Sequence, residues 1–218
     1  MAPPPAPFPD RLDAAAGRVQ SMHTGAVIAV DTTRISLLLR IRNADDAAAW
    51  TQFDTIYRPI LFKFAAARGL DHAAAEDVVQ HCMVAVSEHI RSFEYDPSRG
   101  RFKGWLRTLV NNKIRNLLRD RRDQIAQTKD FNIADAREDA PDELFEKVWL
   151  DEHLKHALRT VRADVEPATF AAFQSYVIEE RPIEEVCETC KMNPNQVHAI
   201  KWRMTKKLRE AMADLSGD

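Results

Sequence analysis

Apolar side chains that recur every three or four residues are the feature that most limits the fold of this chain. Between residues 100 and 122, for example, Leu106, Val110, Ile114 and Leu117 follow this spacing. An α-helix with such a spacing places these side chains on one face, whereas a strand would need strict alternation. Only 6 glycines occur in the 218 residues, and few segments alternate polar with apolar residues. The pattern therefore predicts an all-α protein.

The opposite face of this predicted helix carries amide and guanidinium groups. Residues 99–122 hold nine Lys or Arg and one acid, a net charge of +8, although the whole chain has a formal charge of −2. A local positive field of this kind attracts a polyanion, and the rings of Phe102 and Trp105 among the cations are suited to stack on unpaired bases. We therefore predict a nucleic-acid-binding helix, with a solvated basic face as the alternative. Its polar positions are Thr108, Asn111, Asn112, Arg115, Asn116 and Arg119.

Two helices are predicted between residues 35 and 69. The first is short and has Ile35, Leu38, Leu39 and Ile41 on its apolar side. The second carries a broad apolar stripe and ends at Gly69, because glycine readily adopts the left-handed conformation that terminates helices.

A third helix, over residues 71–91, has an acidic and polar face. Its apolar positions are Val78, Cys82, Val86 and Ile90. The remaining positions would be exposed, and such a face usually just meets water. They include Glu76, Asp77, Gln80, His81 and Glu88.

The composition reverses after Arg122. Residues 123–146 hold eight acids and two bases, a net charge of −6, with little apolar periodicity. This composition is typical of a linker, which we place at 123–143. Residues 1–32 open with a Pro-rich run that cannot build a packed core, so we expect no fixed structure there. The prediction is two small helical domains, at 33–122 and 144–218, joined by an acidic flexible linker.

The second domain contains two helices separated by a tight turn. Pro182 begins the first, residues 191–193 form the turn, and Pro194 begins the second. The first of these helices is acidic, whereas residues 191–209 carry six basic residues and no acid. This arrangement predicts a helix-turn-helix whose second helix enters a DNA major groove. Its outward positions are Asn195, His198, Ala199, Trp202, Lys206 and Arg209.

The cysteines do not indicate a metal or redox centre. Cys187 and Cys190 form a Cys-x-x-Cys motif, but a structural zinc site needs four ligands and no second motif supplies them. Both cysteines are in register with Ile183 and Val186, so we interpret them as buried core residues and expect no metal and no cofactor. A thiol or zinc enzyme that uses this pair is the alternative.

The sequence also lacks the marks of a membrane protein and of most enzymes. No stretch approaches the roughly 20 apolar residues of a membrane span, and the Pro-rich start lacks the order of a secretion signal. No Gly-rich phosphate loop and no Ser/His/Asp arrangement can be placed. We expect a cytoplasmic protein that is not an enzyme.

The order of these parts resembles the extracytoplasmic-function (ECF) sigma factors of bacterial RNA polymerase, in particular the kind found in planctomycete-like bacteria. In the first domain the resemblance is carried by AAWTQFDTIYRPIL, AEDVVQHCMVAV and FEYDPSRGRFKGWLRTLVNNKIRNLLR. In the second it is carried by RPIEEVCETCKMNPNQVHAIKWRMTKKLRE. The run AEDVVQ followed by FxYDPxRGRFxGWL is highly specific. The resemblance covers about residues 36–122 and 144–212.

The resemblance implies a transcription initiation factor that binds core RNA polymerase and directs promoter recognition and melting. The domain at 33–122 would be sigma region 2, which binds the polymerase clamp helices and the promoter −10 element, with the loop before the basic helix taking a flipped base. The domain at 144–218 would be sigma region 4, which reads the −35 element as duplex DNA. The acidic linker would pass through the polymerase near its active site and RNA exit path. An anti-sigma protein is a further candidate partner.

The resemblance also assigns residues to each contact. The clamp contact falls to Asp77, Gln80, His81 and Val84, and His81 stands where the family often has an acid. The −10 contact falls to Arg101, Phe102, Lys103, Trp105, Thr108, Asn111, Asn112, Arg115, Asn116 and Arg119, with Asn116 in place of a frequent Asp. The −35 contact falls to Asn195, Gln196, His198, Ala199, Lys201, Trp202, Arg203 and Lys206. The alternative function is a stand-alone helix-turn-helix regulator, which would bind its operator without polymerase.

Overall fold

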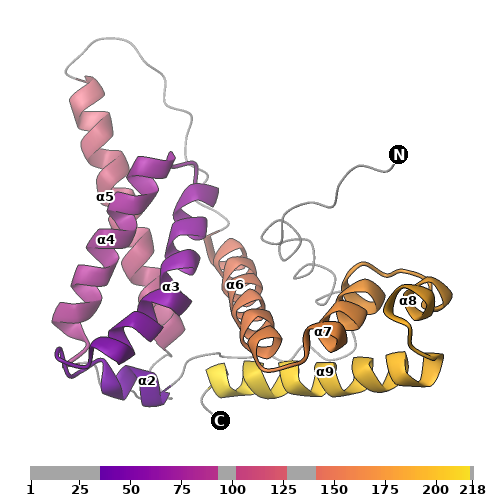
Figure 1. Ribbon diagram of the computed structural model, residues 1–218. Coiled ribbons are helices and arrows are strands. Elements are labelled where there is room, and N and C mark those ends of the chain that lie inside the picture. Colours follow the sequence, from indigo (N-terminus) through magenta and orange to yellow (C-terminus); the bar gives the residue numbers. More distant parts are fainter. Residues whose placement is uncertain (1–34, 93–101, 127–140, 217–218) are drawn as a thin grey trace. The chain divides into compact units, whose positions relative to one another are not determined.

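The computed structural model of the protein consists of helices and the turns between them (Figure 1). The structure describes residues 35–92, 102–126 and 141–216, and within these ranges there is no strand. The prediction of an all-α protein is therefore confirmed. No helix in the described ranges has the length and apolar character needed to cross a membrane. The elements are α2 (Ile35–Arg40), α3 (Ala47–Ala67), α4 (His72–His89), α5 (Phe102–Ala126), α6 (Pro141–Ala163), α7 (Pro167–Phe173), the π-helical turn η1 (Gln174–Ile178), α8 (Ile183–Cys190) and α9 (Pro194–Ser216).

The described part of the chain divides into two compact units, and the boundary between them lies within α6. The first unit ends at Leu150 and the second begins at Asp151. The sequence predicts that the second domain starts at 144. The structure differs, because it assigns the first turns of α6 to the first unit. The expected extension at 1–32 and most of the expected linker at 123–143 lie outside the described residues, although α5 continues to Ala126, past its predicted end at 122.

Helices α3, α4 and α5 pack against one another in the first unit. Each turns its predicted apolar stripe inward, except that Leu117, at the end of the predicted stripe of α5, is half-buried. Helix α2 differs from the prediction, because Leu39 is 53% exposed while Leu37, Leu38 and Ile41 are buried. A helix of only six residues buries one side, and in α2 that side carries Leu37 and Leu38, with Ile41 buried just after the helix end. The buried stripes of the longer helices include Phe53, Ile56, Tyr57, Ile60 and Phe64 of α3, Val78, Cys82 and Val86 of α4, and Leu106, Val110 and Ile114 of α5.

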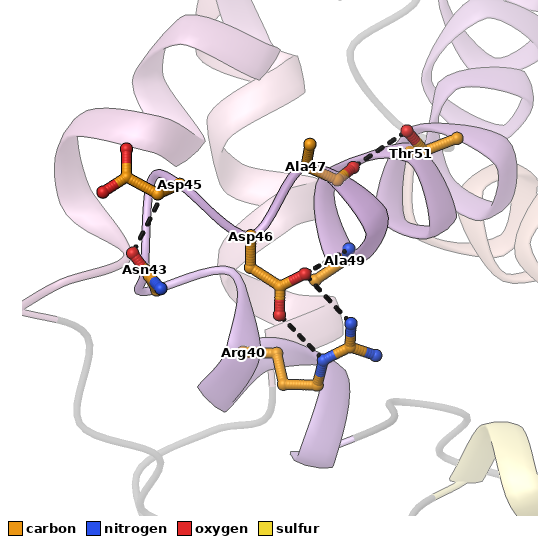
Figure 2. Close-up of polar contacts among 7 residues, drawn as sticks. All are labelled: Arg40, Asn43, Asp45, Asp46, Ala47, Ala49 and Thr51. Carbon is orange, nitrogen blue, oxygen red and sulfur yellow. Dashed lines mark hydrogen bonds and ion pairs between the residues drawn. The ribbon is translucent and has the colours of Figure 1, made fainter.

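Carboxylates fix the starts of α3 and α4. Figure 2 shows that Asp46 accepts a hydrogen bond of 2.9 Å from the N–H of Ala49 and two of 3.0 Å from the guanidinium of Arg40. Asp71 caps α4 in the same way, by accepting from Ala74 at 2.9 Å. Such caps satisfy backbone N–H groups that have no partner inside the helix. The Arg40–Asp46 contact also ties α2 to the start of α3.

The second unit packs α7 and α8 against α9. Its core includes Phe170 and Phe173 of α7, Val186 of α8, and Val197, Ile200, Met204 and Leu208 of α9. Asp164 forms an ion pair with Lys207 of α9, which lowers the pKa of this carboxyl below its ordinary value.

The turn between α8 and α9 is tightly specified. Lys191 adopts the left-handed conformation, with φ of 55°, and its N–H and that of Met192 both donate to the carbonyl of Cys187. This double contact is how a left-handed residue terminates a helix. The N–H of Asn193 donates to the side-chain oxygen of Gln196 at 2.8 Å, and the N–H of Gln196 donates to that of Asn193 at 2.9 Å. The reciprocal pair forms a capping box at the start of α9.

The Arg40–Asp46 contact makes an acid-dependence testable. The hydrogen bonds from Arg40, and then that from Ala49, lower the pKa of Asp46 below its ordinary value. A carboxyl with a lowered pKa in the folded state stabilises that state above its unfolded pKa of about 4, and this contribution is lost as the pH falls through the lower folded pKa. Asp46→Asn keeps a good N-cap but removes the charge.

We therefore expect Asp46→Asn to lower the melting temperature at neutral pH, and the difference from the unsubstituted chain to shrink below about pH 4. Asp45→Asn, at an exposed neighbouring position, is the matched control. A deficit for Asp46→Asn that stays constant into strong acid would contradict the assignment.

Candidate nucleic-acid interface

The polar face of α5 lies at the surface, as predicted. Asn112, Arg115 and Asn116 are exposed and lie within about one turn of one another. Arg119 is also exposed and is 3.9 Å from the carboxylate of Asp120, a distance at which an ion pair between exposed groups is weak. The side chains of this face can therefore reach an external ligand.

Two members of the predicted face bond to their own helix. The hydroxyl of Thr108 donates to the carbonyl of Gly104 at 3.0 Å, and the side-chain amide of Asn111 donates to the carbonyl of Arg107 at 3.1 Å. Asn111 is also half-buried. These bonds leave Asn112, Arg115 and Asn116 as the better placed residues for base edges and phosphates.

Phe102 lies in the core rather than at the surface, which corrects the prediction that its ring is available to stack on a base. Its exposure is 0%, and its ring centroid is 5.4 Å from that of Tyr57 and 6.0 Å from that of Phe53. Trp105 contacts the Phe102 ring at 5.5 Å and is half-buried. The physical reason is visible in the sequence, because Phe102 precedes Leu106 by four residues and so continues the apolar stripe of α5.

Lys103 is covered by α6, a contact that the sequence did not predict. Its ammonium group pairs with the carboxylate of Glu146 and lies 5.6 Å from the ring centroid of Trp149. In the sequence, Glu146 is the last acid of the run 123–146 whose composition predicts a linker. The sequence feature that could have predicted this contact is the four-residue spacing of Phe145 and Trp149, which are both buried on one side of α6. Arg101 lies outside the described residues.

The four residues expected to bind the polymerase clamp form one exposed row on α4. Asp77, Gln80, His81 and Val84 follow one another at helical spacing and are all exposed, Val84 by 50%. An exposed valine is apolar surface available to a partner. Nδ1 of His81 lies 2.7 Å from the carbonyl oxygen of Asp77, which holds the ring against the helix.

Glu76 does not belong to this row. Its carboxylate accepts a hydrogen bond of 3.1 Å from the guanidinium of Arg58 on α3, which also contacts Asp54. The acid therefore contacts α3 and does not belong to the outward row, although a pair with both side chains more than 40% exposed adds little to stability. Of the acidic face predicted from the sequence, Glu76 contacts α3, whereas the row that begins at Asp77 faces outward.

Most of the residues predicted to read duplex DNA lie on the exposed side of α9. Trp202 is 67% exposed, and the ammonium of Lys206 lies 5.8 Å from its ring centroid. Lys201 is half-buried, with its ammonium 5.5 Å from the ring of Tyr176. Gln196 is occupied by the capping box. The exposed members of the set are Asn195, Gln196, His198, Ala199, Trp202, Arg203 and Lys206.

Cys187 and Cys190 are half-buried, which corrects the expectation that both are core residues. Helix α8 has only eight residues and turns Val186 inward, so that the two thiols flank its buried side. Cys82 is buried, and burial raises the pKa of its thiol to about 12. Within the described ranges, no group of three or more His, Cys, Asp or Glu is arranged to hold a metal ion.

Residues 55–124, which run from the middle of α3 to the end of the basic face of α5, match the family model of sigma-70 region 2. No curated protein matches the chain. Among solved structures, a similar chain is the sigma factor RpoE in complex with the anti-sigma factor NepR from Bartonella quintana, at 19% identity and a TM-score of 0.31 over 75% of this chain and 96% of that chain.

The burial of Phe102 makes a stability prediction. We expect Phe102→Ala to lower the free energy of unfolding by about 3–5 kcal/mol, because it leaves a cavity between α3 and α5. Phe102→Leu should lose less, since it retains most of the apolar volume. Urea denaturation followed by circular dichroism measures both. Wild-type stability for Phe102→Ala would show that the ring is not a core residue.

Proposed function

We propose that the chain is an ECF sigma factor that binds core RNA polymerase and directs promoter recognition and melting, and the match of residues 55–124 to sigma-70 region 2 supports this proposal. The observation that carries the proposal is the exposed face of α5, where Asn112, Arg115 and Asn116 stand within the matched range. A sigma factor acts in transcription initiation by binding, and the proposal assigns no catalytic residue.

In this proposal α5 contacts the promoter −10 element. Arginine donates to phosphate oxygens, and asparagine offers both a donor and an acceptor to a base edge. Trp105, which is half-buried, is the ring nearest the surface at the start of the helix. Because Phe102 is buried, stacking on an unpaired base would fall to Trp105 or to residues before α5.

The row on α4 is proposed to bind the polymerase clamp helices. It combines a charge at Asp77, amide and imidazole groups at Gln80 and His81, and exposed apolar surface at Val84. A surface that is charged at one end and apolar at the other suits a helical partner with basic and apolar residues. An anti-sigma partner stays a prediction of the resemblance.

The α8–turn–α9 arrangement is proposed to read the −35 element. The capping box fixes the start of α9. In this proposal Asn195 and His198, near that start, read base edges, because recognition helices contact bases with their N-terminal residues. Lys206 lies further along the helix, where a phosphate contact is expected. A stand-alone regulator would use the same surface, and the requirement for core polymerase separates the two functions.

The clamp contact can be tested by charge reversal. We expect Asp77→Lys combined with Gln80→Ala to weaken core polymerase binding at least tenfold, an effect of about 1.4 kcal/mol or more, as for polar groups at an interface centre. Asp45→Lys is the control, because it makes the same charge change at an exposed site in the turn before α3. Unchanged affinity of the double variant, with normal circular dichroism, would refute this role of α4.

The −35 contact can be tested with a pair of lysines on α9. Lys206 is exposed and only loosely paired, 3.8 Å from the carboxylate of Glu210, whereas Lys207 is in close contact with Asp164 of the same unit. Replacing a phosphate-binding lysine by alanine should make the slope of log affinity against log salt shallower by about one unit. We expect this change for Lys206→Ala in the complex with core polymerase and promoter duplex, and none for Lys207→Ala. Equal slopes for the two variants would argue against the proposed face.

A further inference from the structure

The first turns of α6 cover a cation that belongs to the proposed DNA-binding helix. The side chain of Lys103 is only 15% exposed, although it is one of the cations of the basic run that forms α5. Its ammonium group is held between the carboxylate of Glu146 and the ring of Trp149, whose centroid is 5.6 Å away. The paired residues are 43 positions apart in the chain, so this contact is made by the fold and not by local geometry.

Aromatic packing anchors this part of α6 to the first unit. Phe145 and Trp149 are 0% and 1% exposed. The ring of Phe145 lies 5.1 Å from that of Phe64, and the ring of Trp149 lies 5.7 Å from that of Tyr57, measured between centroids. Buried aromatic side chains contribute large apolar areas to a contact. The position of Glu146 is therefore set by the buried residues on either side of it.

The ion pair itself is easier to break than the aromatic anchor. The side chain of Glu146 is 52% exposed, and ion pairs with exposed partners are weak and screened by salt. A carboxylate and a phosphate offer an ammonium group the same chemistry, an anionic oxygen. A phosphate oxygen could take the place of Glu146 while Phe145 and Trp149 remain packed.

We propose that Glu146 masks Lys103 by standing in for a nucleic-acid phosphate, so that single-stranded DNA must displace this carboxylate before it gains the full charge of α5. Residues 145–149 thus form an intramolecular clasp over the start of the DNA-binding helix. The inference rests on the proposed function of α5. It assigns a DNA-competing role to a residue that follows the acidic linker.

The experiment measures binding of the full chain to a fluorescent single-stranded oligothymidylate at low salt, by anisotropy. Glu146→Gln removes the competing charge, and we expect it to tighten binding about two- to fivefold, the range that one exposed ion pair supports. Glu143→Gln is the matched control, because Glu143 is an exposed glutamate on the same helix and the charge change is identical. Circular dichroism checks that both variants are folded.

A double-mutant cycle locates the effect at Lys103. In a Lys103→Met background, Glu146→Gln should no longer improve binding, because the masked cation is absent. Equal affinities for Glu146→Gln and Glu143→Gln, or a gain that persists without Lys103, would overturn the clasp.

A separate variant distinguishes failure of the clasp from failure of the proposed function. Arg115→Ala should weaken oligothymidylate binding whether or not the clasp exists, because Arg115 is exposed on α5 and distant in sequence from Glu146. If Arg115→Ala weakens binding and Glu146→Gln has no effect, only the clasp is wrong. If neither variant changes binding, both the clasp and the role of α5 are overturned.

Discussion

The contact of Phe102 with Tyr57 and Phe53 is the interaction on which the proposed DNA-binding face depends. Burying Phe102 of α5 against α3 fixes the rotation of α5 about its axis. This rotation determines which residues of α5 face outward. The apolar stripe that continues from Phe102 to Ile114 is fully buried. Arg115 and its polar neighbours are exposed as a consequence. Hydrophobic packing thus sets the position of the charges, and electrostatics then sets which ligand they attract.

The acidic residues of the first unit differ in what they contact. A nearly neutral chain carries a strongly basic helix next to an acidic one, and the structure separates the acids by their tasks. Glu76 holds Arg58, Glu146 holds Lys103, and Asp77 faces outward. An outward acid can meet a basic partner, whereas an acid that is already paired within the unit is less available to one. The exposed polar face of α5 and the exposed row on α4 are therefore suited to two different partners.

The sequence was sufficient for the features that depend on local periodicity and capping. The helical stripes, the cap at Asp71 and the helix starts at Pro182 and Pro194 follow from residues close together in the chain. It was not sufficient where contacts with residues far away in the sequence determine whether a side chain is buried. An aromatic ring among cations is compatible with base stacking or with a core, and the choice was made by Tyr57, on another helix. The docking of α6 was hidden because its acidic composition resembles a linker, while the partners of Phe145 lie far back in the sequence. The half-burial of Cys187 reflects the shortness of α8, which a spacing pattern does not reveal.

The most direct test of the central claim is run-off transcription by core RNA polymerase on fragments of the source genome, with and without this protein. The account predicts discrete transcripts that require both the polymerase and the protein, because α4 would bring the basic face of α5 and the α8–α9 pair to promoter DNA only on the enzyme. If the protein bound the same fragments unaided and yielded no transcript with core polymerase, it would be a stand-alone regulator, and the account would be contradicted.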